Sequence, residues 1–354
     1  MSDIRRGKSR RHGRARRMDA ARQWRDGILD EDAPEKVRWS RELKKTKPKV
    51  ARSEGYPAEE LEGTVLEVNR RTCRILAREG VEFSCHLPTN LDLSEFTGMA
   101  AGDNVLFSPE LGRSGLIKRI LPRKNQIIRC APDDRKHQML VLAANVDAVI
   151  ILFSFKQPSF KGRLLDRYLV RMEKTGIDPV ICLNKFDLKK KIPAEIIYLK
   201  KLGYNIHFCS ARSGYGMDGL FNLIQGGKAV VTGPSGVGKS SIIRYFNPDL
   251  GVKTGPVRKS DGTGRHITTR SNCYPVSGDT WIIDSPGLRE MAVRDIPAEE
   301  LVKGFRDFDK LAEHCVYRNC RHVKEEGCAV KEAVEKQQVP VFRYQSYLNI
   351  VKEP

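Results

Sequence analysis

One octapeptide constrains the fold of this chain more than any other feature. Residues 233–240 read Gly-Pro-Ser-Gly-Val-Gly-Lys-Ser and match the G-x-x-x-x-G-K-[ST] pattern in full. Apolar residues 229–232 predict a strand before it, and residues 240–246 predict a helix after it. Such a loop turns its N–H groups toward phosphate oxygens at a helix N-terminus. The context predicts a phosphate-binding loop in an α/β sheet and disfavours a chance glycine-rich turn.

Individual residues of this loop have distinct expected roles. Lys239 is expected to reach the β- and γ-phosphates, and Ser240 to hold Mg²⁺. We expect nucleotide contacts along the whole run and at the residue after it, namely Gly233, Pro234, Ser235, Gly236, Val237, Gly238, Lys239, Ser240 and Ser241.

An acidic residue ends another apolar stretch downstream. Asp284 follows residues 281–283 and precedes Ser-Pro-Gly. Ligands of open α/β sheets bind at the carboxyl ends of the strands. We therefore expect Asp284 to act in catalysis beside Lys239 and to help hold Mg²⁺, with the N–H of Gly287 meeting the γ-phosphate. Taken alone, Asp-Ser-Pro-Gly is a common turn.

A base-reading motif follows the buried strand predicted over residues 179–183. It comprises Asn184, Lys185, Phe186 and Asp187. A carboxylate there can accept two hydrogen bonds from guanine, whereas adenine lacks both donors. After the next strand, Ser210 and Ala211 can offer a backbone N–H to the guanine O6.

The order of these motifs is unusual. In ordinary GTPases the phosphate loop comes first and the guanine motif last, but here residues 184–187 and 210–211 precede residues 233–240. The same sheet can be built with its chain cut elsewhere, because domain termini often lie close together. The sequence thus predicts a circularly permuted GTPase domain.

The polar, glycine-rich segment 262–269 is expected to be the switch. Thr268 or Thr269 can complete the magnesium shell. Leu288 stands where many GTPases have a Gln that orients water, and leucine cannot do so. His266 is the nearest catalytic candidate, and a switch-loop His without a catalytic role is an equal alternative.

The chain is strongly basic, and the charge is uneven. It carries 63 Lys plus Arg against 44 Asp plus Glu, a net charge of +19. Residues 1–50 hold 17 basic and 8 acidic residues, a net of +9. This segment is too polar to form a core, so we expect a disordered arm that binds nucleic acid or, alternatively, a solvated tail.

A small β-domain is predicted before the α/β region. Residues 81–87 alternate apolar with polar, and residues 64–68, 105–107 and 116–121 are also strand-like. These short strands indicate an OB-type barrel, with Lys118, Arg119, Arg123, Lys124 and Arg129 adding charge on its far side. A generic β-domain without nucleic-acid affinity is the alternative.

Cysteines cluster near the C-terminus, after an amphipathic helix predicted over residues 299–314. Cys315, Cys320, His322 and Cys328 form a C-x4-C-x-H-x5-C pattern. Three thiolates and an imidazole indicate a closed structural zinc site. The alternative is three buried thiols beside an unrelated histidine.

Neither a membrane span nor a secretory signal is expected. The longest apolar run, residues 146–155, is about half of the ~20 residues that a spanning helix needs, and the first 30 residues are polar and basic. The nine cysteines do not indicate a full disulfide framework. A cytoplasmic setting is expected.

Together these motifs resemble the bacterial RsgA/YjeQ family of small-ribosomal-subunit-dependent GTPases. The resemblance covers roughly residues 60–350 and includes Gly264-Arg265-His266, although Ile267 stands where the family has Thr. It implies a monomeric cytoplasmic GTPase that binds GTP or GDP, Mg²⁺, one zinc ion, the small ribosomal subunit and its rRNA. It also implies subunit-stimulated hydrolysis in late assembly.

The fold class expected is α/β, a circularly permuted P-loop GTPase domain between an OB-like barrel and a zinc-binding helical module. The expected divisions are 1–55 (arm), 56–128 (barrel), 129–295 (GTPase) and 296–354 (zinc module). Two other functions stay open. One is an RNA-binding assembly factor that uses GTP or GDP only as a conformational ligand; the other is an ATPase with a nucleic-acid arm.

Overall fold

The structure is a computed structural model that describes residues 60–69, 71–87, 98–130, 139–189, 191–248, 271–285, 288 and 296–352. Several predictions lie outside these residues: the arm 1–55, the switch residues His266, Thr268 and Thr269, and Gly287. In the part of the chain that is described, no helix is both long and apolar enough to cross a bilayer.

The first region is a closed five-stranded barrel, as the alternating sequence predicts. Its strands are β1 (Leu61–Val68), β2 (Thr72–Ala77), β3 (Glu82–His86), β4 (Asn104–Glu110) and β5 (Ser114–Ile120). They run in the order β1-β2-β3-β5-β4, and β4 returns to β1. Every pairing is antiparallel except β3 with β5. Phe83 and Phe107 fill the centre with their rings 5.0 Å apart.

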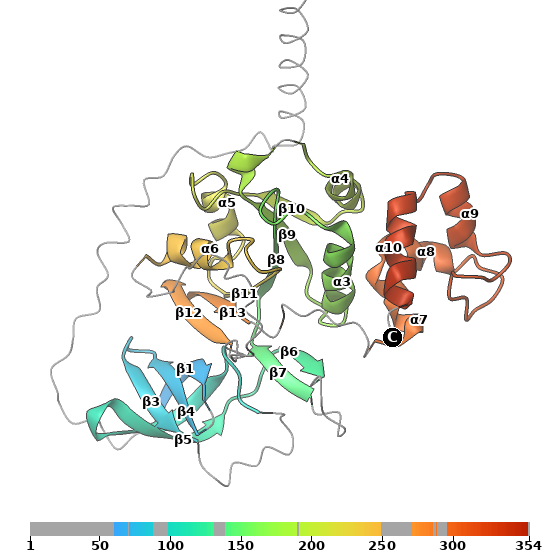
Figure 1. Ribbon diagram of the computed structural model, residues 1–354. Helices are drawn as coiled ribbons and strands as arrows, with labels where there is room; N and C mark the ends of the chain where they lie inside the picture. The colour runs from blue at the N-terminus through green and yellow to red at the C-terminus, as the bar shows by residue number, and fades with distance from the viewer. Residues whose placement is uncertain are drawn as a thin grey trace, which may run out of the picture. The chain divides into compact units, whose positions relative to one another are not determined.

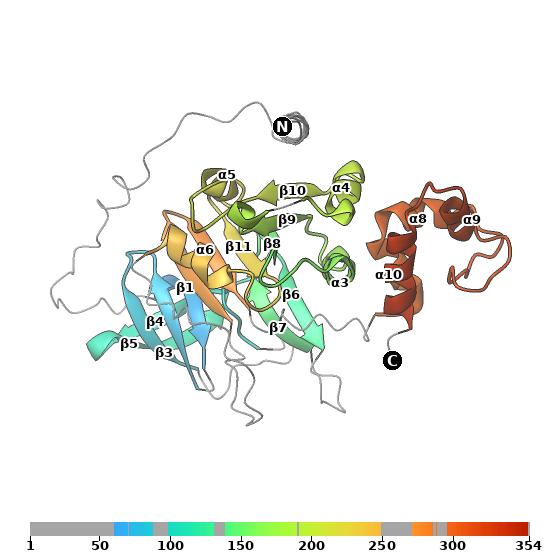
Figure 2. The same ribbon diagram turned by 45° about the horizontal axis from the view of Figure 1, so that its top comes forward.

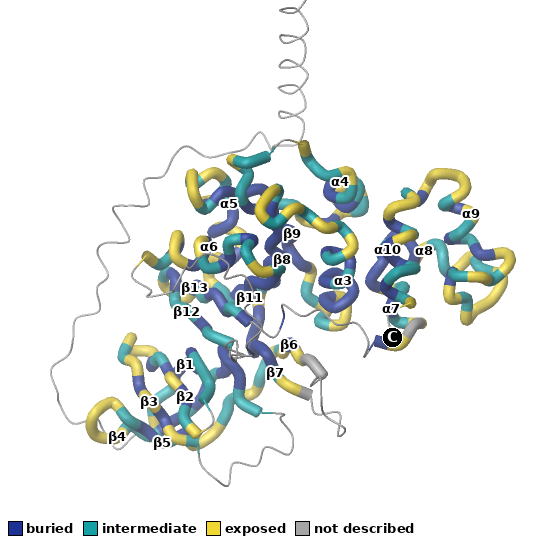
Figure 3. The backbone as a smooth tube through the Cα atoms, in the orientation of Figure 1, coloured by how far each residue is buried: buried dark blue, intermediate teal, exposed yellow. Residues whose placement is uncertain are grey.

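The second region is a sheet with helices on both faces (Figures 1 and 2). Its strands are β8 (Ala148–Ser154), β9 (Pro179–Asn184), β10 (Asn205–Phe208), β11 (Lys228–Thr232), β12 (Asn272–Ser277) and β13 (Thr280–Asp284). The order is β10-β9-β8-β11-β13-β12, and only β12 is antiparallel to its neighbour in this region. Strands β8, β9 and β11 are almost wholly buried (Figure 3), which is why their sequences are continuous apolar runs.

The helices of this sheet follow from its strand order. They are α3 (Gly162–Glu173), α4 (Ala194–Lys201), α5 (Met217–Asn222) and α6 (Lys239–Phe246), with a short 3₁₀ turn η2 (Phe186–Leu188). Strand order advances one way through α3 and α4 and the other way through α5 and α6. Right-handed crossovers therefore put the first pair on one face and the second pair on the other, as Figure 2 shows.

Two features of the sheet were not predicted. A hairpin of β6 (Gln126–Cys130) and β7 (Met139–Ala144) forms a separate two-stranded sheet. Strand β12 pairs with β1 through Asn272 and Glu67, so the barrel and the larger sheet are hydrogen-bonded into one. An irregularity between Val65 and Glu67 of β1 precedes this pairing, and such bulges re-aim a strand.

The single helix predicted over residues 299–314 is wrong. The structure has α7 (Ala298–Leu301), the 3₁₀ turn η4 (Val302–Gly304) and α8 (Arg306–Ala312), followed by α9 (Ala329–Glu335) and α10 (Val341–Val351). Phe305 leaves helical backbone angles, and both Phe305 and Phe308 then become fully buried against Tyr347. Packing of these rings overrides the helical periodicity.

The prediction that Arg123 adds charge to the barrel surface is also wrong. Its guanidinium pairs with Asp103 at 2.7 Å, and the two side chains are 4% and 0% exposed. Arg123 also donates to the carbonyl oxygen of Gly98. A buried charge needs such a partner, so this arginine holds the end of the barrel together.

Candidate nucleotide and metal sites

The predicted site residues meet at one edge of the sheet because their strands are parallel. Asn184 ends β9, Thr232 ends β11 and Asp284 ends β13. The register pairs Asn184 with Ser154, and Asp284 with Val231, next to the phosphate loop. Motifs far apart in the sequence thus lie at neighbouring carboxyl ends.

The phosphate loop is held closely against β8. A Cβ on Gly233 would collide with the carbonyl oxygen of Leu152, so only glycine fits there. Lys239 is 6% exposed, and its Nζ donates to the carbonyl oxygens of Gly233 and Pro234 at 2.6 and 2.7 Å. The ammonium is thus already inside the loop, where it can exchange these carbonyls for phosphate oxygens.

Asn184 joins the base motif to the phosphate loop. Its Nδ2 donates to the carbonyl oxygen of Val237 at 2.9 Å, and its Oδ1 accepts from the N–H of Ala211 at 3.1 Å. Only 2% of the residue is exposed. A Cβ on Gly238 would strike the Asn184 amide. Asn184 therefore fastens three loops together, a structural role that the motif alone does not reveal.

Lys185 makes a second link between the same loops. It lies in the left-handed region, with φ of 60°, and its Nζ donates to the carbonyl oxygens of Gly236 and Gln157. Burial lowers the pKa of this ammonium, while the nearby Asp187 opposes the shift. Its side chain therefore lies across the pocket, against the phosphate loop.

Asp187 is oriented by the next loop. The hydroxyl of Ser210 donates to Asp187 Oδ1 at 2.6 Å, and Ser210 is fully buried. The carboxylate keeps capacity for further donors, as recognition of the guanine N1–H and N2–H edge requires. Phe186, between these polar residues, stacks on Tyr215 with ring centroids 4.7 Å apart and supports the loop.

A cavity of about 660 Å³ opens where these loops meet, within the range of ligand sites. Asn184, Lys185, Asp187, Ser210 and Ala211 line it, as do Gly238 and Ser241 of the phosphate loop. Sequence analysis missed further lining residues: Gln157, Leu188, Arg244, Tyr245 and Pro248. Helical spacing from Ser241 puts Arg244, Tyr245 and Pro248 on one side of α6, a signal that could have found them.

The predicted magnesium ligands are oxygen donors, which suits a hard cation. Ser240 begins the second position of α6, and Asp284 ends the strand next to β11. Hydroxyl and carboxylate thus come from the two segments that flank the phosphates. Leu288 is 2% exposed, so its side chain faces the core rather than an attacking water.

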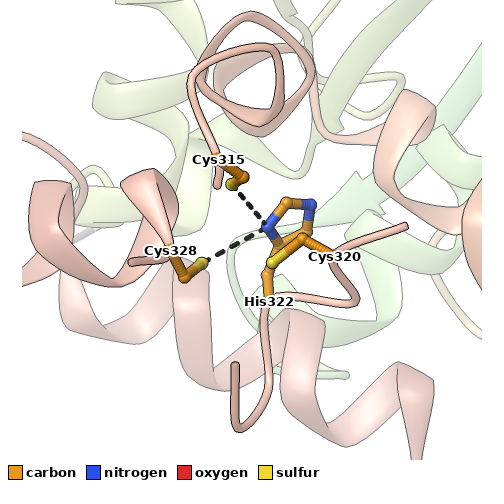
Figure 4. A group of neighbouring side chains, drawn as sticks. All are labelled: Cys315, Cys320, His322 and Cys328. Atoms are coloured by element: carbon orange, nitrogen blue, oxygen red, sulfur yellow. Dashed lines mark hydrogen bonds between the residues drawn. The ribbon is translucent and has the colours of Figure 1, made fainter. Parts of the chain in front are cut away.

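Cys315, Cys320, His322 and Cys328 form one cluster (Figure 4). Their sulfur and nitrogen atoms all lie within 4.8 Å of one another. His322 Nδ1 is 3.6 Å from Cys315 Sγ and 3.4 Å from Cys328 Sγ. A tetrahedral zinc site separates sulfur from nitrogen by about 3.6 Å. The four residues therefore fit zinc.

The surroundings of the cluster favour a metal-bound state. Burial raises the pKa of the Cys320 thiol to about 12 and lowers the pKa of His322, so the thiolate needs a cation while the imidazole is already neutral. The hydroxyl of Tyr344 donates to the His322 carbonyl oxygen at 2.9 Å, and that of Tyr347 donates to Arg321 at 2.8 Å. Helix α10 thus holds the metal loop in place.

Glu325 shapes the same loop. Although burial opposes it, N–H groups including those of Arg321, Val323 and Lys324 hold the pKa of Glu325 at about 2. The three contacts are 3.2, 2.9 and 3.0 Å long. An ionised carboxylate therefore organises the backbone between His322 and Cys328.

Comparison with known proteins agrees with this arrangement. The profile of the family described as RsgA GTPase matches residues 120–294. A protein named small ribosomal subunit biogenesis GTPase RsgA, from Haemophilus influenzae (strain 86-028NP), is 36% identical over 283 residues, which cover 77% of this chain and 79% of the relative. A protein of the same name from Actinobacillus pleuropneumoniae serotype 5b (strain L20) is 31% identical and covers 92% of this chain and 94% of its own length.

Two solved structures are also similar. YjeQ from Thermotoga maritima has a TM-score of 0.62 and 28% identity, covering 83% of this chain and 98% of its own. YloQ, titled a circularly permuted GTPase, has a TM-score of 0.60 and 25% identity, covering 86% and 99%. These likenesses extend well beyond the phosphate loop and include the permuted order of the motifs.

Proposed function

Because this chain belongs to the RsgA family of GTPases, we propose that it binds the small ribosomal subunit and its rRNA and hydrolyses GTP in late subunit assembly. Its relatives are named for small-subunit biogenesis. The observation that carries the proposal is the pocket in which the guanine motif and the phosphate loop are hydrogen-bonded to each other. Subunit binding stimulates hydrolysis, and product release lets the protein leave.

Each site residue has a proposed role. Asp187 reads guanine, the Ala211 N–H meets O6, and Lys239 holds the β- and γ-phosphates. Ser240 and Asp284 hold Mg²⁺, which supplies charge neutralisation between the β- and γ-phosphates when bound. Thr268 or Thr269, Gly287 and His266 complete the site in this proposal, and Cys315, Cys320, His322 and Cys328 hold one structural zinc.

The rRNA contacts are proposed for the barrel and the arm. Lys118 and Arg119 are exposed on β5, and residues 1–50 carry a net charge of +9. We propose divisions at 1–55, 56–128, 129–295 and 296–354, and a monomer acting in the cytoplasm. Since each neutralised phosphate releases a counterion, deleting residues 1–50 is expected to lower both rRNA affinity and its salt dependence. GTP affinity is expected to stay the same.

Phosphate release with and without purified small subunits tests the proposal. We expect slow release from the protein alone and faster release with small subunits, because binding must supply the water-positioning group that Leu288 cannot provide. Large subunits at the same concentration serve as the control. Equal release with either subunit, or with none, would contradict the proposed stimulation.

The burial of Leu288 favours a second candidate function. With 2% of this residue exposed, GTP and GDP can act only as conformational ligands of an RNA-binding assembly factor with negligible turnover. Nucleotide-dependent subunit binding without phosphate release would support this function. Displacement of labelled GTP by ATP at equal concentration would instead indicate an ATPase.

A further inference from the structure

One side-chain hydrogen bond joins the two segments that flank the phosphates and has no place in the roles described so far. Thr232 ends β11 and directly precedes Gly233, whereas Leu288 directly follows residues 284–287. The hydroxyl of Thr232 donates to the carbonyl oxygen of Leu288 at 3.0 Å. The two residues are 0% and 2% exposed, so water does not compete for this bond.

The surroundings of Thr232 do not themselves require a hydroxyl. Val230 and Val231 precede it in the same buried strand, and valine has nearly the shape of threonine. A buried hydroxyl or carbonyl without a partner costs about 1–3 kcal/mol. Thr232 and Leu288 satisfy each other, so movement of either segment away from the other would expose both to this cost.

A second hydrogen bond holds the same turn from its other side. The hydroxyls of Ser271 and Ser285 are 2.9 Å apart, and Ser285 is 1% exposed. Ser285 follows Asp284, whose register partner is Val231. The two ends of the turn are thus tied, one to the strand of the phosphate loop and the other to the residue before β12.

We propose that Thr232 is a positioning residue for GTP hydrolysis, fixing residues 284–288 relative to the phosphate loop through the Leu288 carbonyl. The inference rests on the proposed roles of Asp284 and the phosphate loop. Preorganised groups contribute to catalysis only when their spacing is held. Since GDP lacks the γ-phosphate, the bond acts on GTP turnover and GTP affinity rather than on GDP affinity.

The test compares Thr232→Val with Thr232→Ser in the full chain. Valine keeps the shape and removes the hydrogen bond, while serine keeps the hydroxyl. Thr280→Val is the matched control, because the Thr280 hydroxyl is also buried, at 2% exposure, and accepts from the Gly226 N–H at 2.9 Å. Thr280 lies at the other end of β13, away from the phosphate segments.

We expect Thr232→Val to lower kcat, with small subunits present, by roughly three- to tenfold, the effect of one hydrogen bond. The ratio of GTP to GDP affinity is expected to fall by a similar factor, with GDP affinity unchanged. Thr232→Ser restores most of both, and Thr280→Val lowers Tm without changing either. Equal kcat and an equal affinity ratio in Thr232→Val and Thr280→Val would overturn the proposal.

The affinity ratio separates failure of this inference from failure of the proposed function. Absence of turnover in the parent protein would contradict the proposed hydrolysis. The ratio of GTP to GDP affinity would still test Thr232, because it depends only on binding. A changed ratio in Thr232→Val alone supports the positioning role, and an unchanged ratio contradicts it.

Discussion

The nucleotide pocket and the metal cluster of this protein are built in opposite ways. The pocket draws its residues from several strand ends, and hydrogen bonds such as Asn184 to Val237 and Ser210 to Asp187 hold them before any ligand binds. The metal cluster comes from one short segment between α8 and α9. Its thiols need a cation to ionise. We conclude that the pocket depends on the sheet, and the cluster on its ion.

Removing a metal ligand is expected to have the largest effect. His322→Ala takes away one of four ligands, and zinc binding supplies roughly 10–16 kcal/mol of folding free energy in small metal modules. We expect zinc loss and rapid hydrogen exchange over residues 296–352, with GTP affinity retained. His314→Ala is the control, because His314 is exposed and lies outside the cluster. Loss of GTP binding in His322→Ala would break the comparison.

The next largest effect is expected at the guanine-reading carboxylate. Asp187→Asn replaces an acceptor by a group that also donates, so GTP affinity is expected to fall by roughly 10²–10⁴ and xanthosine triphosphate to be preferred. Competition with labelled nucleotide measures both. Asp218→Asn makes the same charge change at an exposed residue of α5. An equal GTP affinity in Asp187→Asn and the parent would show that Asp187 does not read the base.

Asn184→Ala sharpens the comparison, because Asn184 acts on the pocket and not on one ligand. The variant removes two buried hydrogen bonds that connect Val237 and Ala211. We expect GTP and GDP affinity to fall together by roughly 10- to 100-fold, with zinc content unchanged. Titration calorimetry with both nucleotides measures this. A loss confined to GTP would mean that Asn184 contacts the γ-phosphate side instead.

The smallest expected effect is a pH dependence of stability from His207. Burial lowers the pKa of His207, against a hydrogen bond from its Nε2 to the Gly216 carbonyl oxygen at 2.6 Å. The unfolded chain therefore binds a proton at a higher pH than the folded one. Stability from this group is present above the unfolded pKa of about 6.5 and falls as the solution becomes more acidic.

Thermal unfolding of the parent and of His207→Gln between pH 7.5 and 5.5 measures this contribution. We expect a smaller acid-dependent loss of Tm in the variant, since glutamine does not titrate. Metal-loaded protein is required throughout, so that acid release of zinc does not contribute. Identical pH profiles of Tm would mean that His207 does not contribute to acid sensitivity.

Sequence patterns predicted the regular parts of the fold and failed where packing decides. The barrel strands and the buried strands β8, β9 and β11 follow directly from alternation and from apolar runs, and the structure confirms them. The pairing of Asn272 with Glu67 has no local signal, because hydrogen-bonding between strand edges leaves no pattern in either strand. The break at Phe305 was missed because helical periodicity does not register a ring that must turn into the core.

The pocket shows the same division between local and tertiary information. Each motif is readable because its chemistry is local: glycines for a tight loop, a carboxylate for guanine, cysteines at ligand spacing. Their convergence follows once the strands are parallel. Tyr245 and Gln157 were missed since a single polar or aromatic side chain on a helix or loop gives no sign of facing a cavity.

By itself the sequence determined the permuted α/β domain, the barrel and the identity of the candidate ligands, because these depend on periodicity and on short motifs. Only the tertiary structure decided which polar groups are buried together. Arg343 of α10 is 1% exposed and pairs with Asp166 of α3 and Asp307 of α8. In sequence it resembles any solvated arginine, because burial of a charge depends on partners brought from distant segments.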